Sequence, residues 1–307
     1  MTAVTLIENF RAVFYAPFYL PIALGAYDAE GLQVTLKTSG DAARTASSLI
    51  AGEGDVSWGG PLRLMAALEK NPQAAAFAFC EAVGRDPFFL LGREPNPGFQ
   101  VPQLRGRKLA VVTEVPTPWM CLRQDLRLAG VDPSDITTIP GRTMGENVAA
   151  LRSGEADVIQ VFQPYAGTLL LGGKAHVWYT AASRGPVSYT TLNTTRDFAG
   201  RNPDALRGMC RAMYRTQKWI AAHSAADLAA TLADFFPDIP RPLLVACFES
   251  YKGSGLWNRD PVLQRAGFDW LRDAALADGI LKKKFTYEEC VDTTHALAVM
   301  KENPPAL

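Results

Sequence analysis

The chain has 307 residues, and its 31 lysines and arginines balance its 31 aspartates and glutamates, which leaves a formal net charge of zero at pH 7. Such a balance provides no basic surface for nucleic acid or for an anionic membrane, and no apolar run has the length of a transmembrane helix. The fractions of 48% hydrophobic and 20% charged residues are those of a globular protein large enough for two domains.

Strands and helices are predicted to alternate along the first third of the chain. Apolar patterns indicate strands at 4–9, 32–38, 55–59 and 74–80. The intervening segments indicate helices at 16–31, 41–51 and 61–70. Asp41 is a candidate N-cap, Gly52 ends the helix that follows it, and Pro61 stands at a first helical position. This order predicts a mostly parallel sheet covered by helices on both faces.

The same alternation returns in the middle of the chain. Strands are indicated at 107–113, 134–140, 157–162 and 174–180, and one helix at 119–129. Thr117 is the candidate N-cap of that helix and Pro118 its first residue. Thr143 and Glu146 form a capping box, in which each side chain bonds a free backbone N–H of the other, and the helix that it opens ends at Gly154.

One short unit occurs twice. LIAGEGDV at 49–56 and LRSGEADV at 151–158 share a leucine and then Gly-Glu-x-Asp-Val at the same spacing. In both copies a helix is predicted to end at the glycine, the chain turns at Glu-x-Asp, and a strand follows. Two similar α/β lobes, each with its own sheet, explain this repetition.

We therefore predict two doubly wound α/β lobes joined by a two-strand hinge. The first lobe is predicted to comprise residues 1–90 and 186–307, and the second residues 91–185. The extended segments 87–93 and 186–195 are the predicted crossovers, and the mostly helical remainder packs back on the first lobe. Clefts between domains and at the carboxyl ends of parallel strands are the usual places for ligands.

The opening segment NFRAVFYAPFYLPIALGAYDAEGLQVTL, at 9–36, resembles a known family. It is similar to the start of periplasmic binding proteins, of the type II two-lobe fold, for nitrate, taurine, alkanesulfonates and thiamine pyrimidine precursors. The matching residues are Ala16, Pro17, Phe18, Tyr19, Gly25, Tyr27, Glu30, Gly31, Leu32 and Val34. Both Gly-Glu-x-Asp-Val units and LRGRKLAVV at 104–112 fit the same family.

This resemblance implies two lobes that close around a small molecule by hinge motion. It also implies an ABC transporter permease as partner, with the membrane reached only through that transporter. We expect a monomer. Because the N-terminal MTAVTLIENF has no signal-peptide pattern, a periplasmic location is expected if a leader was trimmed, and a cytoplasmic one otherwise.

Loops at the carboxyl ends of the predicted strands are expected to line the cleft. The first lobe supplies Asn9, Phe10, Phe14, Tyr15, Ser39, Gly40, Trp58, Gly59, Gly60, Cys80 and Glu81. The second lobe supplies Glu114, Thr117, Trp119, Phe162, Gln163 and Tyr165, and Ser188 and Tyr189 stand near the hinge. Core packing explains a single aromatic as well as ligand contact does, but aromatic and small polar residues clustered at several strand ends are typical of a small-molecule pocket.

The segment TEVPTPWM at 113–120 argues against an anionic ligand. Oxyanion-binding relatives present a Gly/Ser-rich loop and free N–H groups at this helix, whereas Pro116 and Pro118 each lack an N–H and Glu114 repels anions. Ser39-Gly40 still offers one helix N-terminus. The aromatic supply, with Glu81, Glu114 and Gln163 as acceptors, favours a flat, neutral or cationic nitrogen heterocycle such as a pyrimidine of the thiamine-precursor type.

Several alternatives remain open. A sulfonate, taurine or nitrate ligand is one. An enzyme on the same fold is another, either like the fungal thiamine-pyrimidine synthase or like a desulfinase. The first uses a Lys, a His and a Cys-rich iron motif, but SWGGPLRLMAA at 57–67 has neither Lys nor His. The second needs a cleft cysteine with a histidine, and no histidine is near Cys80 or Cys121 in sequence. A regulatory module would carry a DNA-binding segment, and the sequence has none.

The cysteines and histidines complete the prediction. Five scattered cysteines without a CxxC pair are expected to be buried free thiols, and the three histidines have no metal-ligand spacing. We therefore predict a binding protein without catalysis, without a cofactor and without a metal site.

Overall fold

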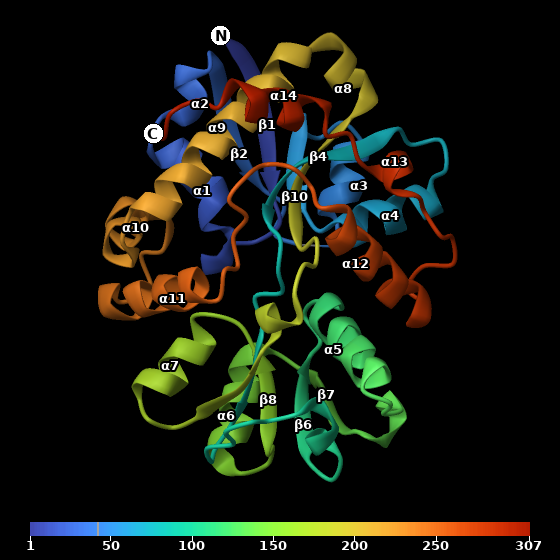
Figure 1. Ribbon diagram of the computed structural model, residues 1–307, viewed down its shortest axis with the longest axis vertical. Coiled ribbons are helices and arrows are strands. Elements are labelled where there is room, and N and C mark those ends of the chain that lie inside the picture. The colour runs from blue at the N-terminus through green and yellow to red at the C-terminus, as the bar shows by residue number, and fades with distance from the viewer. Residues whose placement is uncertain (42) are drawn as a thin grey trace.

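The computed structural model describes residues 1–41 and 43–307. They form two five-stranded mixed sheets, each flanked by helices, which lie one above the other in Figure 1. We call the upper sheet with its helices the first lobe and the lower sheet with its helices the second lobe. Both chain ends lie on the first lobe (Figure 1).

The first sheet has the strand order β2-β1-β3-β10-β4. Its strands are β1 (Thr2–Glu8), β2 (Leu32–Thr38), β3 (Val56–Gly59), β4 (Ala76–Val83) and β10 (Thr190–Thr195). Strand β1 pairs in parallel with β2 and β3, whereas β10 runs antiparallel to β3 and β4. The sheet is therefore mixed, because β10 returns from the second lobe in the opposite direction.

The helices between β1 and β4 are η1 (Val13–Tyr15), α1 (Ala16–Ala23), α2 (Ala26–Ala29), α3 (Thr45–Ile50) and α4 (Pro61–Lys70). The predicted continuous helix at 16–31 breaks at Gly25, whose φ of 66° only glycine adopts readily. The helix predicted to start at Asp41 starts at Thr45, because the Asp41 carboxylate accepts a hydrogen bond from Ala43 N–H in a local turn instead.

The second sheet has the order β7-β6-β8-β5-β9. Its strands are β5 (Phe89–Gly92), β6 (Lys108–Val112), β7 (Thr137–Arg142), β8 (Val158–Val161) and β9 (His176–Thr180), and its helices are η2 (Val101–Leu104), α5 (Thr117–Leu128), η3 (Pro133–Asp135), α6 (Met144–Ser153) and α7 (Tyr165–Leu171). The predicted capping box is confirmed, with Glu146 N–H donating to Thr143 Oγ1 at 3.2 Å and Thr143 N–H donating to Glu146 Oε2 at 2.7 Å. Helix α5 begins at Thr117 itself, one residue earlier than predicted.

The repeated Gly-Glu-x-Asp-Val unit makes the same contact in both lobes. Asp55 accepts a hydrogen bond from Thr5 N–H of β1 at 2.8 Å, and its own N–H donates to Thr5 O at 2.9 Å. Asp157 accepts from Lys108 N–H of β6 at 2.8 Å, and its N–H donates to Lys108 O at 2.9 Å. The aspartate thus satisfies a backbone N–H of the neighbouring strand, at Thr5 within β1 and at Lys108 at the start of β6, and fixes how the central strand enters the sheet.

The chain crosses from the first sheet to the second between β4 and β5 and returns between β9 and β10 (Figure 1). The predicted lobe boundary after residue 90 falls inside β5, whose Phe89 and Leu90 already pair with β8. The return passes through η4 (Ala181–Arg184). The exact residues at which one lobe gives way to the other remain a prediction.

A buried ion network holds the two crossovers together. Arg184 Nη1 donates to Asp86 Oδ2 at 2.8 Å, and Arg184 Nε donates to Asp125 Oδ1 of α5 at 2.7 Å. The Arg184 and Asp86 side chains are 5% and 1% exposed, and burial raises the pKa of Asp86 although Arg184 opposes that shift. The Trp270 ring of the first lobe lies 5.0 Å from the guanidinium, so both crossovers and both lobes meet at one cation.

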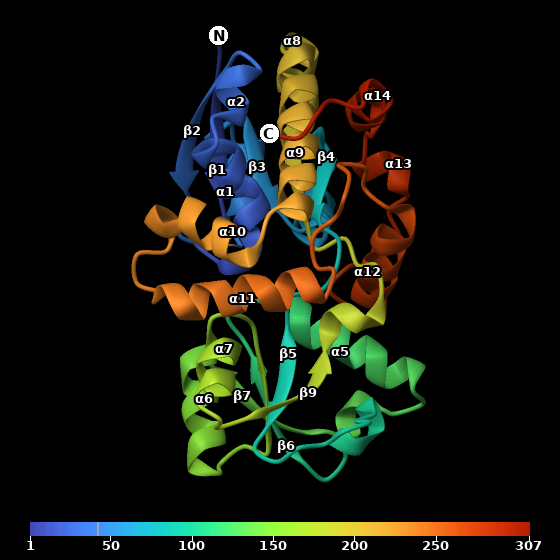
Figure 2. The same cartoon turned by 60° about the vertical axis from the view of Figure 1, so that its left-hand side comes forward.

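The remaining chain is helical. Its elements are α8 (Arg196–Arg201), α9 (Pro203–Ala222), α10 (Ala225–Thr231), η5 (Ala233–Phe235), α11 (Arg241–Gly253), α12 (Arg265–Ala277), α13 (Tyr287–Cys290) and α14 (Thr294–Glu302). Helix α9 packs on α1, α2 and β4, whereas α11 contacts α7 and α12 contacts α5 of the second lobe (Figure 2). In the part of the chain that the structure describes, no helix combines the length and hydropathy of a membrane span. The sequence analysis did not identify α7 or α11.

Candidate ligand-binding cleft

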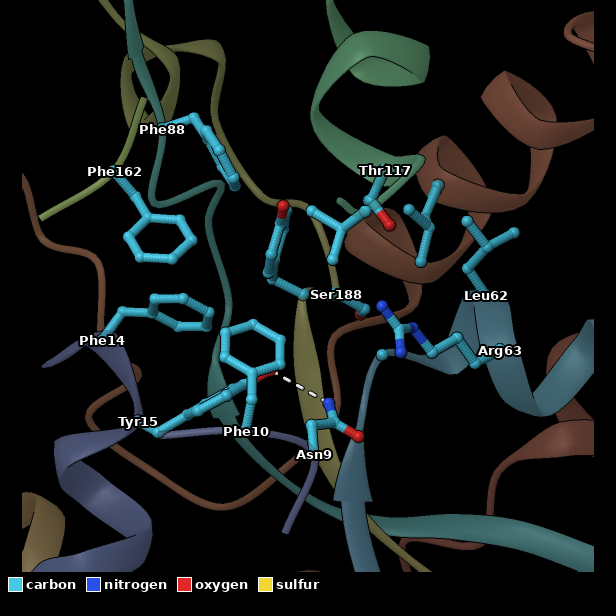
Figure 3. A pocket seen from close by; sticks show the side chains of 14 residues that line it. Asn9, Phe10, Phe14, Tyr15, Leu62, Arg63, Phe88, Thr117, Phe162 and Ser188 are labelled. Atoms are coloured by element: carbon cyan, nitrogen blue, oxygen red, sulfur yellow. Dashed lines mark hydrogen bonds between the residues drawn. The ribbon is translucent and has the colours of Figure 1, made fainter. Parts of the chain in front are cut away.

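A small cavity lies between the lobes where several strands end. We call it the inner chamber. It has a volume of about 30 Å³, which is room for one or two water molecules. Its lining residues come from both lobes and from the crossovers (Figure 3): Asn9, Phe10, Phe14, Tyr15, Gly60, Leu62, Arg63, Phe88, Val115, Thr117, Phe162, Ser188, Tyr189 and Leu271.

A larger depression adjoins the inner chamber, and we call it the outer groove. Its volume is about 510 Å³, within the range of pockets that bind small molecules. It is lined by α7 and by the loops after β1, β6, β8 and η5, with Glu114, Gln163 and Tyr165 among its polar residues. Phe10, Val115 and Phe162 line both spaces, so these three side chains separate the chamber from the groove.

One side of the inner chamber is aromatic. Phe10 of the first lobe and Phe162 of the second are nearly parallel, with ring centroids 6.4 Å apart and an interplanar angle of 15°. Phe14 and Phe88 meet Phe162 edge to face at 5.3 and 5.1 Å, and Tyr189 meets Phe14 at 6.2 Å. Each such pair contributes roughly 1 kcal/mol beyond its buried area, and Phe162 therefore makes most of the aromatic contact between the lobes.

The opposite side of the chamber is polar (Figure 3). Asn9 is 1% exposed, and its Nδ2 donates to the Tyr15 hydroxyl at 3.0 Å. Among the described residues, Asn9 Oδ1 has no hydrogen-bond partner. Burial raises the pKa of Tyr15 and keeps the phenol neutral. A buried acceptor without a donor is costly, so this oxygen is suited to receive a donor from a ligand.

Arg63 is a functional candidate that the sequence analysis missed. It stands in the first turn of α4, after Pro61 at the first helical position, and it lines the chamber. Its Nη1 is buried and has no partner among the described residues. Burial lowers the pKa of its guanidinium, against the opposing influence of Tyr15, Tyr189 and Asp41. The available signal was a basic residue in the first turn of a helix that begins at the carboxyl end of a predicted strand.

Most residues predicted to line the cleft do meet there. The inner chamber includes Asn9, Phe10, Phe14, Tyr15, Gly60, Thr117, Phe162, Ser188 and Tyr189, and the outer groove includes Gly40, Glu114, Gln163 and Tyr165. Gly59 lies behind the chamber, where a Cβ would stand 3.5 Å from Asn9 Oδ1. At Gly60 a Cβ would approach Tyr189 O to 2.9 Å, so the close approach of β3 to the hinge return requires glycine.

Besides Gly59, five predicted residues lie outside both spaces, two of them in the framework of the first lobe. Trp58 is fully buried and stacks on Phe18 at 5.0 Å, behind Tyr15, so it belongs to the core. The Ser39 hydroxyl donates to Asn9 O at 3.1 Å and stabilises the loop after β2 rather than facing the cavity. In both cases the strand end was located correctly, but the side chain supports the residues that line the cleft.

The other three are Cys80, Glu81 and Trp119. Cys80 is fully buried within β4. Glu81 Oε2 accepts from Asn258 Nδ2 at 2.7 Å and from Gln264 N–H at 3.2 Å, and burial raises its pKa to about 7. Trp119 packs against the separate core of the second lobe. The β4 residues face inward because the C-terminal helices cover this strand, which the local sequence did not indicate.

Two predicted hydrogen-bond acceptors of the outer groove are already engaged by the protein. Glu114 Oε2 accepts from Met144 N–H at 2.8 Å and so caps the first turn of α6. Gln163 Oε1 accepts from Gly167 N–H at 2.6 Å, and Gln163 N–H donates to the Tyr251 hydroxyl of α11 at 3.0 Å. Both residues therefore have a structural function at this position, and Gln163 also links the two lobes.

The comparisons with known proteins agree with this architecture. Residues 14–226 match the model of the family described as NMT1/THI5 like. The chain belongs to this family. A protein of Bacillus subtilis (strain 168), which bears the provisional name binding protein YtlA, is 26% identical over 304 residues, or 98% of this chain and 91% of that protein.

Two solved structures illustrate the fold of this NMT1/THI5-like protein. The periplasmic aliphatic sulphonate binding protein SsuA from Escherichia coli superposes with a TM-score of 0.76 at 18% identity, over 94% of this chain and 97% of that one. A mutant of DszB in complex with biphenyl-2-sulfinic acid superposes with a TM-score of 0.68 at 12% identity, over 97% and 99%. The family resemblance and the two-lobe α/β fold predicted from the sequence are confirmed.

The thiols of this NMT1/THI5-like protein are poor candidates for catalysis. All five cysteines are buried and free, and burial raises the pKa of both Cys80 and Cys121 well above the ordinary value. A raised pKa keeps the thiol protonated, and the protonated form is not a nucleophile. None of the described residues that line either space is a histidine, so the chamber offers neither half of a Cys–His pair.

Proposed function

We propose that this protein is the solute-binding component of an ABC-type import system and acts without catalysis. The observation that supports this best is a single cavity to which both lobes contribute side chains, with Phe10 on one side and Phe162 on the other. A ligand held there contacts both lobes only when they are closed. Its binding therefore shifts the protein towards the closed conformation, which is the conformation a permease partner would recognise. The corresponding location is the periplasm.

The ligand that fits the aromatic side of the chamber is a flat ring, and we propose a pyrimidine-like heterocycle. The Phe10 and Phe162 centroids are 6.4 Å apart and their planes differ by 15°. A third ring placed between them needs about 7 to 8 Å, which is two contact distances of about 3.5 to 4 Å. Parting the lobes by roughly 1 Å would therefore admit a ring with a phenyl face on each side.

Entry requires a wider opening than final binding does. The inner chamber of about 30 Å³ cannot admit a ring, whereas the adjoining groove of about 510 Å³ can. Contacts that must break for the lobes to part include Asp278 with Arg127 of α5 at 3.0 Å and Tyr251 with Gln163 at 3.0 Å. These contacts lie on opposite sides of the cleft, on α11 and just after α12, so a hinge motion at the crossovers breaks both.

Isothermal titration calorimetry with a panel of ligands tests the proposal. The panel contains pyrimidines of the thiamine-precursor type, alkanesulfonates, taurine and nitrate, and small-angle scattering with each ligand that binds measures closure. We expect a ring compound to bind and to reduce the radius of gyration. Phe162→Leu should weaken its binding about fivefold, because one aromatic stacking contact of roughly 1 kcal/mol is lost.

Tyr165→Leu is the matched control for that variant. Tyr165 is a neighbouring aromatic residue that lines only the outer groove, and its loss should change the affinity less than threefold. Stronger binding of nitrate or taurine than of every ring compound would contradict the ligand class. Conversion of any bound compound into a product would contradict the assignment as a binding protein.

A further inference from the structure

Arg63 differs from the other arginines that the protein buries. Arg184 is 5% exposed and binds Asp86 and Asp125, and Arg272 is 9% exposed and binds Asp269 and Asp273. In each case two carboxylates surround one guanidinium, as expected where desolvation of an unpaired charge is costly. Arg63 follows a different pattern.

The structure gives the Arg63 guanidinium no carboxylate partner. Its Nη1 is buried without a hydrogen bond, and the described residues form no ion pair with it. Asp41, the acidic residue whose charge it senses, lies in the outer groove. Since the fold neutralises its other buried arginines, an uncompensated cation beside a cavity indicates that the partner comes from outside the chain.

We propose that Arg63 binds an acid group of the ligand, so that the transported solute is a flat ring bearing a carboxylate or a sulfonate. This inference rests on the proposed function for its location and narrows the ligand class. The planar guanidinium donates two parallel hydrogen bonds to two oxygens of such a group. No other residue type provides this geometry together with a permanent charge.

The arrangement of the chamber also sets the orientation of the ligand. Figure 3 shows Arg63 and Asn9 on one side and the rings of Phe10, Phe14 and Phe162 on the other. An acid group at Arg63 therefore places the attached ring towards Phe10 and Phe162. Asn9 Oδ1, buried and unpartnered, then accepts a hydrogen bond from a ring N–H or amino group. The polar and aromatic sides are thus used by one molecule.

The acidic residue that disfavoured anions at the sequence level does not oppose this orientation. Glu114 lines the outer groove rather than the inner chamber. Its carboxylate also accepts a hydrogen bond from the first N–H of α6, where the helix dipole offsets part of its charge. The inner chamber thus presents the cation Arg63, whereas the outer groove carries three carboxylates, Asp41, Glu114 and Asp238, and one cation, Arg11. This distribution favours a bound ligand whose acid end points inward.

Calorimetry with matched acid and neutral probes tests the inference on the wild-type protein. Orotate and uracil share a pyrimidine ring and differ in the carboxylate, and benzenesulfonate and benzenesulfonamide differ in charge in the same way. We expect the acid of at least one pair to bind about 30-fold more tightly than its neutral partner, a difference of about 2 kcal/mol at 1.4 kcal/mol per tenfold. That preference should shrink as salt is added.

Variants at Arg63 identify the group responsible. Arg63→Gln should remove the preference for the acid, Arg63→Lys should retain part of it, and Arg152→Gln, at an exposed position of α6, should leave it unchanged. Without ligand, Arg63→Met should unfold at the same or a higher temperature than wild type, because an unpaired buried charge is lost. An arginine with a structural role would instead lower the melting temperature.

The outcomes separate this inference from the proposed function. If uracil binds as tightly as orotate and Arg63→Gln changes neither, the acid site is refuted while a ring-binding protein remains. If isethionate, an acid without a ring, binds as well as benzenesulfonate and depends on Arg63, the acid site stands and the ring requirement fails. Absence of binding by both ring acids at millimolar concentration refutes the inference.

Discussion

The two lobes share a framework and differ in what surrounds it. In both, an aspartate after a helix-ending glycine accepts a hydrogen bond from a backbone N–H of the neighbouring strand, at 2.8 Å in each lobe, and both sheets have equivalent strand orders. The edge strands that end the two orders, β4 and β9, differ in exposure. Strand β4 is buried along its whole length, whereas β9 is exposed or half-buried. Helices α9, α13 and α14 pack on β4, so equivalent strands acquire different environments.

The helices after the central strands differ in the same manner. Helix α4 of the first lobe presents Arg63 to the inner chamber. Helix α7 of the second lobe packs against α11, and at Gly167 a Cβ would stand 2.8 Å from Leu243. Backbone contacts therefore fix the framework in both lobes. The equivalent helices then serve different purposes: α4 brings a charge to the cleft, and α7 makes a contact between the lobes.

The largest expected effect comes from the ion network where the lobes join. Arg184→Leu leaves Asp86 and Asp125 buried without their cation and should lower the free energy of unfolding by about 4 kcal/mol, measured by urea denaturation. Arg105→Leu is the control, since its pair with Asp135 is half-exposed and should cost under about 1 kcal/mol. Equal costs for the two variants would mean that the crossovers do not depend on this network.

The free energy of unfolding should depend on pH because of Glu81 in the buried strand β4 of the first lobe. Burial raises the pKa of Glu81 from 4.5 to about 7. Between these values the folded chain retains a proton that the unfolded chain has lost, so the free energy of unfolding decreases as pH rises, by up to about 3 kcal/mol. Glu81→Gln should flatten this slope in urea titrations at several pH values, whereas exposed Glu53→Gln should not. An unchanged slope in Glu81→Gln would mean that another group causes the pH dependence.

The shared aspartate contact should contribute a similar amount to the free energy of unfolding in both lobes. Asp55→Ala and Asp157→Ala each leave one strand N–H without its acceptor and should each lower the free energy of unfolding by about 1 to 2 kcal/mol. Asp197→Ala, at an exposed helix position, provides a control with little expected effect. Costs that differ by more than about 1 kcal/mol would show that the repeat is alike in geometry but not in energetic importance.

The smallest effect on unfolding is expected at the contact between α5 and the residue after α12. Asp278 pairs with Arg123 and Arg127 of the second lobe. Asp278→Asn should change the free energy of unfolding by less than about 1 kcal/mol, because the arginines remain partly solvated, yet small-angle scattering should show a more open average conformation. Asp273→Asn, whose partner Arg272 lies in the same lobe, should leave the scattering unchanged.

The sequence predicted the framework well where the information is local. Gly52 and Gly154 end helices, and Thr143 with Glu146 opens one, because capping and left-handed glycine conformations depend on a few adjacent residues. The break at Gly25 was missed because an apolar pattern on both sides resembles one continuous helix. The strand ends were located closely enough to bring thirteen of the nineteen predicted residues to the inner chamber or outer groove.

What the sequence alone determined is therefore the repeated α/β order, the family and the approximate edge of each sheet at which most of the predicted site residues meet. Only the tertiary structure decided which side chains at that edge face the cleft, why Trp58 and Ser39 support it from behind, and that Arg63 lacks a partner. Pairing and burial depend on residues distant in the chain, and a guanidinium is recognised as unpaired only when all of its neighbours in space are known.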